Sequence, residues 1–530
     1  MAHRIPLLVL AAALSVSLAL APLGPSAPTA EAATFFPLGM FEDNNMLAGD
    51  TARFSTLIAE WGSHSLDSVL FNNSSVQFHE PLLDVSDSKG FNVVFAPMNE
   101  LNSQFLDNPS APATIQTARN VVYPLVNALK AHPSLKGYNL RDDASTAVST
   151  KLALAVQAAR EADASRPATA IIPVGQEAVY TAAKTSPYLT YYYPAKARKQ
   201  PCDWGFTSPT LNQFSQTIRS NIRDKNPSDP TWLILQSHGL STAVEPSADP
   251  NKLRIPTVAE VRLQQWMALG EGARGTFWFI YSTQPGRFVG VEDSPALYDE
   301  IGLVARRVAP LRSILGSLNK TDDYFSLSGS GNRYVSTLVN PATNKYYVIV
   351  ANGNCSSTVG LSVTSTDINA QLKDVETGQV YNLNSPIAFR AGDGKLFEVV
   401  NVQGSLPGAA PTPKPNLVKN GSFETVTGGQ IANWSGPGVV TRDTAVRHTG
   451  TASIRIQGAQ AYTYRYQSLA LKPGTLHTVS YWIKTQNIGG TGVMGRWVNL
   501  TPTFSLSNGP VITGTTDWKQ VSTTFITAAD

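Results

Sequence analysis

Carboxylate side chains recur where short apolar runs of this sequence end. Five of them, Glu42, Asp43, Glu100, Asp142 and Asp143, are candidates for chemistry, and Glu260, which lies before the last apolar run, is a sixth. Two carboxyl groups that flank a glycosidic bond can hydrolyse it, at separations of roughly 5 Å for retention and roughly 6.5 to 9.5 Å for inversion. The sequence supplies enough acids for this chemistry, but it does not pair them.

The adjacent Asp142 and Asp143 are the strongest candidates. Because neighbouring carboxylates repel each other, one of the two should have a raised pKa, which suits a general acid. We expect Asp143 to be the proton donor and Asp142 to orient it or the sugar. The alternatives are hydrogen bonding to sugar hydroxyls and an ion pair with Arg141.

The sequence gives weaker support for a catalytic role of the remaining acids. Glu260 is a catalytic candidate, but Thr257-x-x-Glu260 after Pro256 is also the capping box of a helix start. Glu100 lies in a loop, where functional carboxylates are common. Glu42 and Asp43 are expected to bind substrate. Four further candidates for substrate binding are Tyr193, Trp204, Gln236 and His238, of which Tyr193 and Trp204 suit stacking on a sugar ring.

A barrel of alternating strands and helices would bring these side chains together. Eight apolar runs alternate with helical periods between Thr34 and Gly316, at residues 36–41, 68–71, 91–96, 137–140, 170–174, 189–193, 232–235 and 276–281. Eight such units in about 280 residues predict a closed (β/α)8 barrel over 33–316, with its catalytic groups at the carboxyl ends of the strands. A doubly wound sheet is the alternative, but no glycine-rich turn follows the first strand. Pro124 should kink or break the third helix.

The barrel segment resembles a known family. Three parts carry the resemblance: Gly137-Tyr138-Asn139-Leu140-Arg141-Asp142-Asp143-Ala144, then Tyr192-Tyr193-Pro194 with Gln236, and the block 254–275, which begins Arg254-Ile255-Pro256-Thr257. They are similar to secreted bacterial barrel proteins classed as glycoside-hydrolase-like, which implies a glycosidase. That family tends to carry glutamate where this chain has Asp143. Because a misplacement on the order of 1 Å can cost about a hundredfold in rate, Asp143 serves a differently placed oxygen or the barrel binds without cleaving.

After Gly316, period-two patterns replace the helical ones. They predict a β-sandwich over 317–405 that docks on the barrel, a proline-rich linker over 406–415, and a second all-β domain over 416–530. The opening NLVKNGSFE of the last domain resembles carbohydrate-binding modules with a β-jelly-roll fold. That family usually closes with a strand carrying aspartates, which does not appear before Asp530, so we expect a truncated module.

Aromatic side chains of the last domain could hold a sugar. Trp434 and the alternating Tyr462, Tyr464 and Tyr466 are the candidates, and the three tyrosines form either a sugar platform or a plain surface strand. Trp482 is expected to face the core. The resemblance also implies a structural calcium at Glu424, although its partner carboxylate usually comes from the closing strand; no cofactor is expected for catalysis.

The composition and the N-terminal segment indicate which partners and which compartment to expect. With 41 basic and 38 acidic residues the net charge is +3, and no basic run marks a nucleic-acid partner. Residues 1–32 read as a signal peptide, and no later segment reads as a membrane span, so we expect a secreted monomer that meets an oligosaccharide or polysaccharide. Cys202 and Cys355 fall in different domains, so a bridge between them would have to cross an interface, and we expect two unpaired or loosely coupled thiols.

Three function classes remain after these observations. The first is a glycoside hydrolase with an appended carbohydrate-binding module. The second is a non-catalytic polysaccharide-binding or adhesion protein on a decayed barrel. The third, a polysaccharide lyase, lacks a visible cluster of Lys, Arg or metal ligands beside a base.

Overall fold

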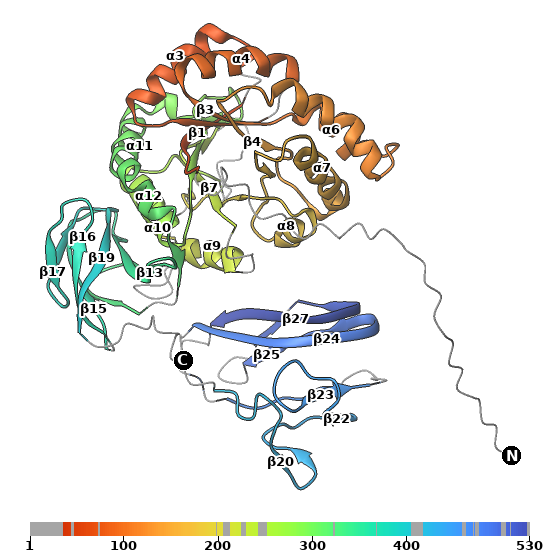
Figure 1. Ribbon diagram of the computed structural model, residues 1–530. Coiled ribbons are helices and arrows are strands. Elements are labelled where there is room, and N and C mark those ends of the chain that lie inside the picture. The colour runs from red at the N-terminus through yellow and green to blue at the C-terminus, as the bar shows by residue number, and fades with distance from the viewer. Residues whose placement is uncertain are drawn as a thin grey trace.

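The computed structural model describes residues 35–43, 47–72, 75–197, 199–204, 213–223, 229–241, 252–321, 324–366, 368–403, 417–457, 463–469, 471, 476–499, 505–508 and 510–526 (Figure 1). The predicted signal peptide and the linker 406–415 lie outside these ranges. No helix in the described ranges combines the length and the apolar character needed to cross a bilayer.

Eight parallel strands form the first domain. They are β1 (Leu38–Asp43), β2 (Ser68–Asn72), β3 (Asn92–Phe95), β4 (Leu135–Asn139), β5 (Ala168–Thr169), β6 (Tyr188–Tyr191), β7 (Thr231–Gln236) and β9 (Thr276–Phe279). Their order in the sheet is β5-β4-β3-β2-β1-β9-β7-β6. A parallel bridge between Ile171 and Leu189 joins the two edge strands, so the sheet closes into the predicted barrel.

Helices surround the barrel, as Figure 1 shows. The longer ones are α3 (Thr51–Ser63), α4 (Val76–Lys89), α6 (Ile115–Leu129), α7 (Ser149–Ala162), α8 (Glu177–Ala183), α9 (Gln213–Arg223), α10 (Val258–Gly270) and α11 (Pro295–Val308). Shorter turns are α5 (Met98–Leu101), η1 (Asn102–Leu106), η2 (Thr146–Val148), η3 (Val291–Asp293), η4 (Ala309–Leu311) and α12 (Arg312–Leu315). Helix α6 continues through Pro124, so the expected break does not occur.

The barrel has two apolar layers because side chains alternate along each strand. On β1, Phe41 belongs to the cluster inside the barrel, whereas Met40 packs outward beneath the helices. The inner cluster also contains Trp232 and Phe277, which lie 6.0 Å apart between ring centroids. Inward-pointing residues at the strand ends therefore surround any opening above this cluster.

The second domain is the predicted β-sandwich. Its strands are β11 (Asn319–Lys320), β12 (Ser326–Gly329), β13 (Arg333–Asn340), β14 (Lys345–Asn352), β15 (Val359–Thr364), β16 (Asn369–Asp374), β17 (Val380–Asn382), β18 (Ile387–Phe389) and β19 (Gly394–Gln403). Six of them form one sheet and β12, β15 and β18 form the other. An apolar core that includes Val348 and Phe397 lies between the sheets.

The sandwich docks on the barrel, as predicted. Arg307 of α11 donates to Glu376 at 2.7 Å and to Asp393 at 2.6 Å, both in the sandwich. The buried Tyr334 donates its hydroxyl hydrogen to Glu271 of the barrel at 2.8 Å. Arg307 and the hydroxyl group of Tyr334 find these hydrogen-bond partners in the other domain, so separating the two domains would remove them.

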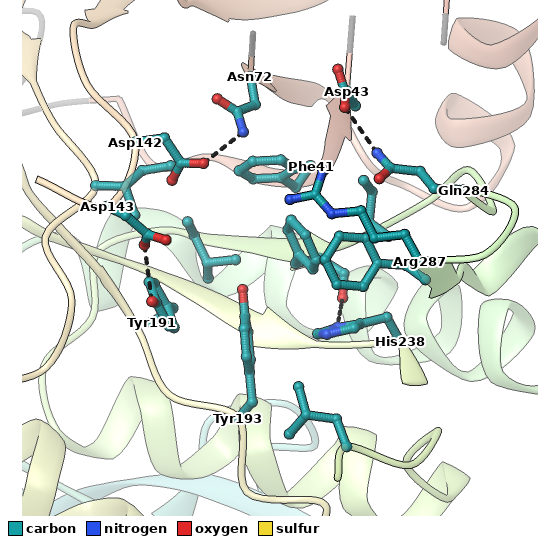
Figure 2. A pocket seen from close by; sticks show the side chains of 16 residues that line it. Phe41, Asp43, Asn72, Asp142, Asp143, Tyr191, Tyr193, His238, Gln284 and Arg287 are labelled. Carbon is teal, nitrogen blue, oxygen red and sulfur yellow. Dashed lines mark hydrogen bonds between the residues drawn. The ribbon is translucent and has the colours of Figure 1, made fainter. Parts of the chain in front are cut away.

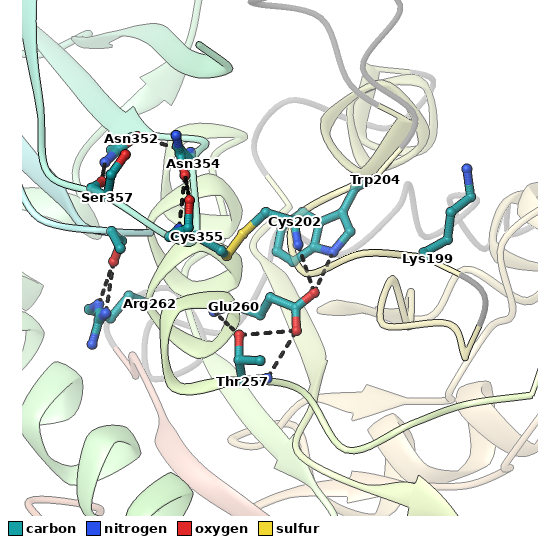
Figure 3. Close-up of a disulfide and its surroundings, with 12 residues drawn as sticks. Lys199, Cys202, Trp204, Thr257, Glu260, Arg262, Asn352, Asn354, Cys355 and Ser357 are labelled. Atoms are coloured by element: carbon teal, nitrogen blue, oxygen red, sulfur yellow. Dashed lines mark hydrogen bonds between the residues drawn. A yellow bond between two sulfur atoms is a disulfide. The ribbon is translucent and has the colours of Figure 1, made fainter. Parts of the chain in front are cut away.

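A disulfide also joins the two domains (Figure 3). Cys202 lies in the loop after β6 and Cys355 in the loop after β14, with their Cα atoms 5.7 Å apart. The expectation of two unpaired thiols was therefore wrong. Docking brings together two loops that are 153 residues apart in the sequence.

The third domain consists of antiparallel strand pairs. Its strands are β20 (Val426–Thr427), β21 (Gln430–Ile431), β22 (Val440–Asp443), β23 (Ser453–Ile456), β24 (Leu476–Val493), β25 (Arg496–Asn499), β26 (Ser505–Asn508) and β27 (Ile512–Ile526). Trp482 of β24 is 45% exposed and stacks on His448 with 3.8 Å between ring centroids. The prediction that Trp482 faces the core was wrong, because its ring lies against His448 and remains exposed.

Candidate functional site

A pocket of about 150 Å³ lies at the carboxyl ends of the barrel strands (Figure 2). That volume is comparable to a cavity that accepts a benzene ring, so it suits one ring-sized unit. Its polar lining consists of Asp43, Asn72, Asp142, Asp143, Tyr191, Tyr193, His238, Gln284 and Arg287, and its apolar lining includes Phe41, Ile171, Ile234, Phe279 and Phe288. Several of the residues that the carboxyl-end rule selected therefore line this pocket.

Asp142 follows β4 and is held by a residue of β2, which lies on the far side of β3 in the sheet. Asn72 at the end of β2 donates its side-chain amide to Asp142 Oδ2 at 2.7 Å. Burial raises the pKa of Asp142 to about 6, and the negative charge of Asp143 adds to the rise. A carboxyl group with this pKa retains its proton in a fraction of molecules near neutral pH, as a general acid requires.

Asp143 adopts the left-handed backbone conformation, with φ at 48°, which aspartate tolerates better than most residues. Tyr191 donates its hydroxyl hydrogen to Asp143 Oδ1 at 2.9 Å and stacks on Tyr193 at 4.9 Å between ring centroids. Arg141 does not pair with either aspartate, because it donates to Asp107 at 2.6 Å. The alternative of an ion pair between Arg141 and the aspartates is therefore not realised.

Asp43 ends β1, which is separated from β4 by two strands in the ring of eight. Figure 2 shows it across the pocket from Asp142. Gln284 donates its side-chain amide to Asp43 Oδ2 at 2.9 Å. Gln284 begins a tight turn in which Arg287 N donates to Gln284 O at 2.9 Å and Gly286 takes a φ of 75°. The turn places the guanidinium of Arg287 over the Phe288 ring, 4.9 Å from its centroid.

His238 forms part of the wall below Arg287. Its Nδ1 lies 2.8 Å from Phe279 O, and because a carbonyl only accepts, Nδ1 carries the hydrogen. Burial lowers the pKa of His238 to about 4, so the ring is neutral above that pH. Nε2 is then an acceptor, and it has no hydrogen-bond partner among the described residues. Tyr193 packs edge-on against this ring at 4.8 Å.

Glu42 was predicted to bind substrate, but it does not line the pocket. The alternation of β1 that points Phe41 and Asp43 inward turns Glu42 outward. Glu42 accepts a hydrogen bond from Ser282 N at 3.1 Å. Burial raises its pKa to about 8. Through the hydrogen bond from Ser282, Glu42 supports the loop after β9 that carries Gln284, on the side away from the pocket.

Glu100 and Glu260 also lie outside the pocket lining. Glu100 accepts from Val76 N at 3.1 Å, at the start of α4. Glu260 forms the predicted capping box with Thr257. Its fully buried carboxylate is paired with Arg254 at 2.7 Å, which satisfies the charge. These contacts give both glutamates structural partners.

Trp204 and Gln236, two further substrate-binding candidates, are buried away from the pocket. Trp204 donates its indole hydrogen to Glu260 Oε1 at 3.2 Å (Figure 3). Gln236 accepts from Ala195 N at 2.8 Å and donates to His238 O at 3.1 Å. Both residues fix loops that border the pocket.

Four polar pocket residues were not among the predicted ones: Asn72, Tyr191, Gln284 and Arg287. Asn72 and Tyr191 end strands, so the same carboxyl-end rule could have found them. Gln284 and Arg287 lie in the loop after the last strand of the barrel. Their sequence gives no signal beyond the Pro285-Gly286 turn.

One cluster of metal-ligating side chains occurs among the described residues. Asp84, Asp87 and His132 place one ligand atom each within 4.8 Å of one another. His132 Nδ1 lies 2.7 Å from Asp87, which also accepts from Ser134 N. The cluster lies before β4 begins, at the end of the barrel opposite the pocket.

The C-terminal domain presents some of the predicted aromatics. Tyr464 and Tyr466 are exposed, with 6.1 Å between ring centroids, whereas Tyr462 lies outside the described residues. Trp434 donates its indole hydrogen to Asn420 O at 3.0 Å and is partly buried. Glu424 pairs with Arg442 at 3.1 Å and belongs to no group of metal ligands among the described residues.

Comparison with known proteins identifies the last domain. Residues 415–530 match the family model described as carbohydrate binding domain, so the predicted carbohydrate-binding module is confirmed. None of the curated proteins matches this chain.

Solved structures similar to this chain include three hydrolases. One is named glycoside hydrolase (TM-score 0.47, 10% identity, 69% of this chain and 92% of that chain). Another is a glycoside hydrolase family 5 from Bacteroides vulgatus ATCC 8482 (TM-score 0.45, 12% identity, 69% and 89%). The third is an endo-1,4-beta-mannanase from Rhizomucor miehei (TM-score 0.36, 10% identity, 52% and 95%).

Proposed function

We propose that this protein is a secreted glycoside hydrolase that cleaves an extracellular polysaccharide or oligosaccharide. The observation that carries the proposal is the pair Asp142 and Asp43. One carboxyl group has a pKa raised to about 6, and the other faces it across a pocket of single-ring size. Hydrolysis of a glycosidic bond needs two carboxyl groups with these different roles.

Asp142 is the general acid in this proposal. Its proton passes to the glycosidic oxygen as the C–O bond breaks, and the leaving sugar departs as an alcohol. The amide of Asn72 fixes the carboxyl group on β4. The sequence favoured Asp143 as the acid, whereas the burial of Asp142 and its contact with Asn72 favour Asp142.

Asp43 supplies the second carboxylate. From the opposite side it either removes a proton from the attacking water or attacks the anomeric carbon itself, according to its distance from the acid. Gln284 orients it. The rings of Tyr191 and Tyr193 provide an apolar face for the C–H side of a sugar. The C-terminal module raises the local concentration of the barrel on a polymer.

The test is release of reducing sugar from a panel of glucans, mannans, xylans, galactans and amino-sugar polymers. Asp142→Asn removes the proton and should lower kcat by two to four powers of ten, the usual contribution of a general acid. Asp299→Asn, at an exposed side chain of α11, is the matched control and should leave kcat unchanged. Near-full activity of Asp142→Asn on a polymer that the parent chain cleaves would refute the assignment.

A second candidate function is binding without cleavage. The observation in its favour is β7, which ends in the buried structural amide of Gln236 and carries no carboxylate at its carboxyl end. A parent chain that binds members of the panel but cleaves none would establish this function. Asp142, Asp143 and Asp43 would then accept hydrogen bonds from sugar hydroxyls.

A further inference from the structure

The pocket contains more negative charge than glycoside hydrolysis requires. Two carboxyl groups suffice for that reaction, yet Asp43, Asp142 and Asp143 all line the cavity. Asp143 has no cation within ion-pair distance among the described residues, because its neighbour Arg141 is engaged by Asp107. The third carboxylate is left with a tyrosine hydroxyl as its partner.

The wall opposite Asp143 adds a second, independent observation. His238 is 1% exposed, lines the pocket, and leaves its acceptor Nε2 without a partner among the described residues. A buried acceptor without a donor is costly unless a ligand supplies one. Figure 2 shows Tyr193 between the two sides, with its hydroxyl group pointing into the pocket.

These groups together call for a ligand that is rich in hydrogen-bond donors and positively charged. The pocket offers carboxylate oxygens, a neutral imidazole nitrogen and the faces of aromatic rings. A sugar hydroxyl donates one hydrogen, whereas an ammonium group donates three and accepts none. Aromatic faces also attract cations. Arg287 is the one cation in the lining, and it leaves the sum of charges at −2 with three ionised aspartates, or −1 with Asp142 protonated.

We propose that the sugar unit bound in this pocket carries a free amino group, that Asp143 holds its ammonium, and that Nε2 of His238 accepts a hydrogen bond from another donor of the same unit. The substrate class is then a polymer of de-N-acetylated amino sugars, such as glucosamine or galactosamine. This inference rests on the proposed hydrolase function and deepens it. Asp142 and Asp43 remain available for the two steps of hydrolysis.

The experiment compares kcat/KM at pH 6 for three tetrasaccharides with one backbone: a glucosamine oligomer, its fully N-acetylated form and the corresponding glucose oligomer. N-acetylation is the matched control, because it removes the charge and keeps the backbone. An ammonium remains protonated at this pH. We expect kcat/KM for the amino oligomer to exceed the other two by tenfold or more, and the galactosamine series is compared in the same way.

The variant Asp143→Asn tests the assigned contact. It should lower kcat/KM for the amino oligomer by at least tenfold more than it lowers kcat/KM for the glucose oligomer. Equal or higher kcat/KM for the neutral or acetylated oligomers in both series would overturn the inference and leave the proposed hydrolase function intact. Preferential cleavage of uronate oligomers would also overturn it and would assign recognition to Arg287.

If no oligomer is cleaved, the hydrolase function fails and binding decides the inference. Titration calorimetry on the parent chain and on Asp143→Asn distinguishes binding in the pocket from binding to the C-terminal module. A preference of tenfold or more for the amino oligomer that disappears in Asp143→Asn supports the inference. A preference that is absent, or that persists unchanged in the variant, overturns it.

Discussion

Glu42 provides a test of how the rim of the pocket is supported, because its side chain is fully buried behind β1 and its pKa is raised from 4.5 to about 8. Burial is the main cause, the charge of Glu292 adds to it, and the hydrogen bond from Ser282 and the charge of Arg53 oppose it. The folded state therefore holds a proton that the unfolded chain releases between these two pH values.

The sign and size of the effect follow from this linkage. Because the pKa is raised in the folded state, the contribution of Glu42 to stability is fully present below about pH 4.5 and is lost as the pH rises through about 8. Each pH unit between these limits lowers the free energy of unfolding by about 1.4 kcal/mol. Over the whole interval the loss is on the order of 5 kcal/mol.

The perturbation is Glu42→Gln, which preserves the shape and an acceptor for Ser282 N but cannot ionise. We expect the free energy of unfolding of the variant, relative to the parent chain, to rise by several kcal/mol between pH 4.5 and 8. Urea denaturation at each pH, followed by the fluorescence of the buried barrel tryptophans Trp61 and Trp232, measures it. Glu80→Gln, at an exposed position of α4, is the control. Its free energy of unfolding, plotted against pH, should run parallel to that of the parent chain. Parallel curves for Glu42→Gln and the parent chain would refute the reasoning.

Three further predictions concern the site and the domain contacts. Above about pH 6, kcat should fall by up to tenfold per pH unit as Asp142 loses its proton, and a pH–rate profile that is flat to pH 8 would exclude it as the acid. Replacing both Cys202 and Cys355 by serine should lower the free energy of unfolding by up to about 5 kcal/mol, since the bridge spans 153 residues; an unchanged urea midpoint would contradict this. Removing everything after Leu406 should keep the thermal transition of the barrel, whereas a chain that ends at Gly316 should aggregate in light scattering because it exposes the face that docks the sandwich; a well-behaved monomer from the second cut would contradict the docking argument.

The barrel was predictable from sequence because its strands are buried on both faces and appear as short apolar runs. Seven of the eight predicted strands overlap the observed ones. The exception is residues 170–174, where the ladder is formed by Ala168–Thr169 instead. Pro173 has no amide hydrogen, so that run could not continue as a regular strand, and Ile171 contributes a single bridge to β6.

The site was predictable in location but not in detail. Asp43, Asp142 and Asp143 were selected because strand ends converge in a barrel. Which acid has the raised pKa depends on Asn72 and on burial, both set by the packing of neighbouring strands. The pairing of Cys202 with a cysteine in another domain was likewise beyond the sequence, because it follows from a docking geometry that no local pattern encodes.

Gln236 and Glu260, two residues selected from the sequence motifs, influence the pocket through hydrogen bonds to backbone groups of the loops beside it. The side-chain amide of Gln236 donates hydrogen bonds to the backbone carbonyl oxygens of Ala195, His238 and Arg254. Glu260 binds the amide of Cys202 at 2.9 Å, in the loop that the disulfide anchors to the sandwich. The loop that follows Tyr193 is therefore fixed at Ala195 and at Cys202 by side chains that do not line the pocket. Strand β7 ends in the amide of Gln236, which holds the backbone beside the pocket, so the carboxylates of the lining come from the end of β1 and from the segment after β4.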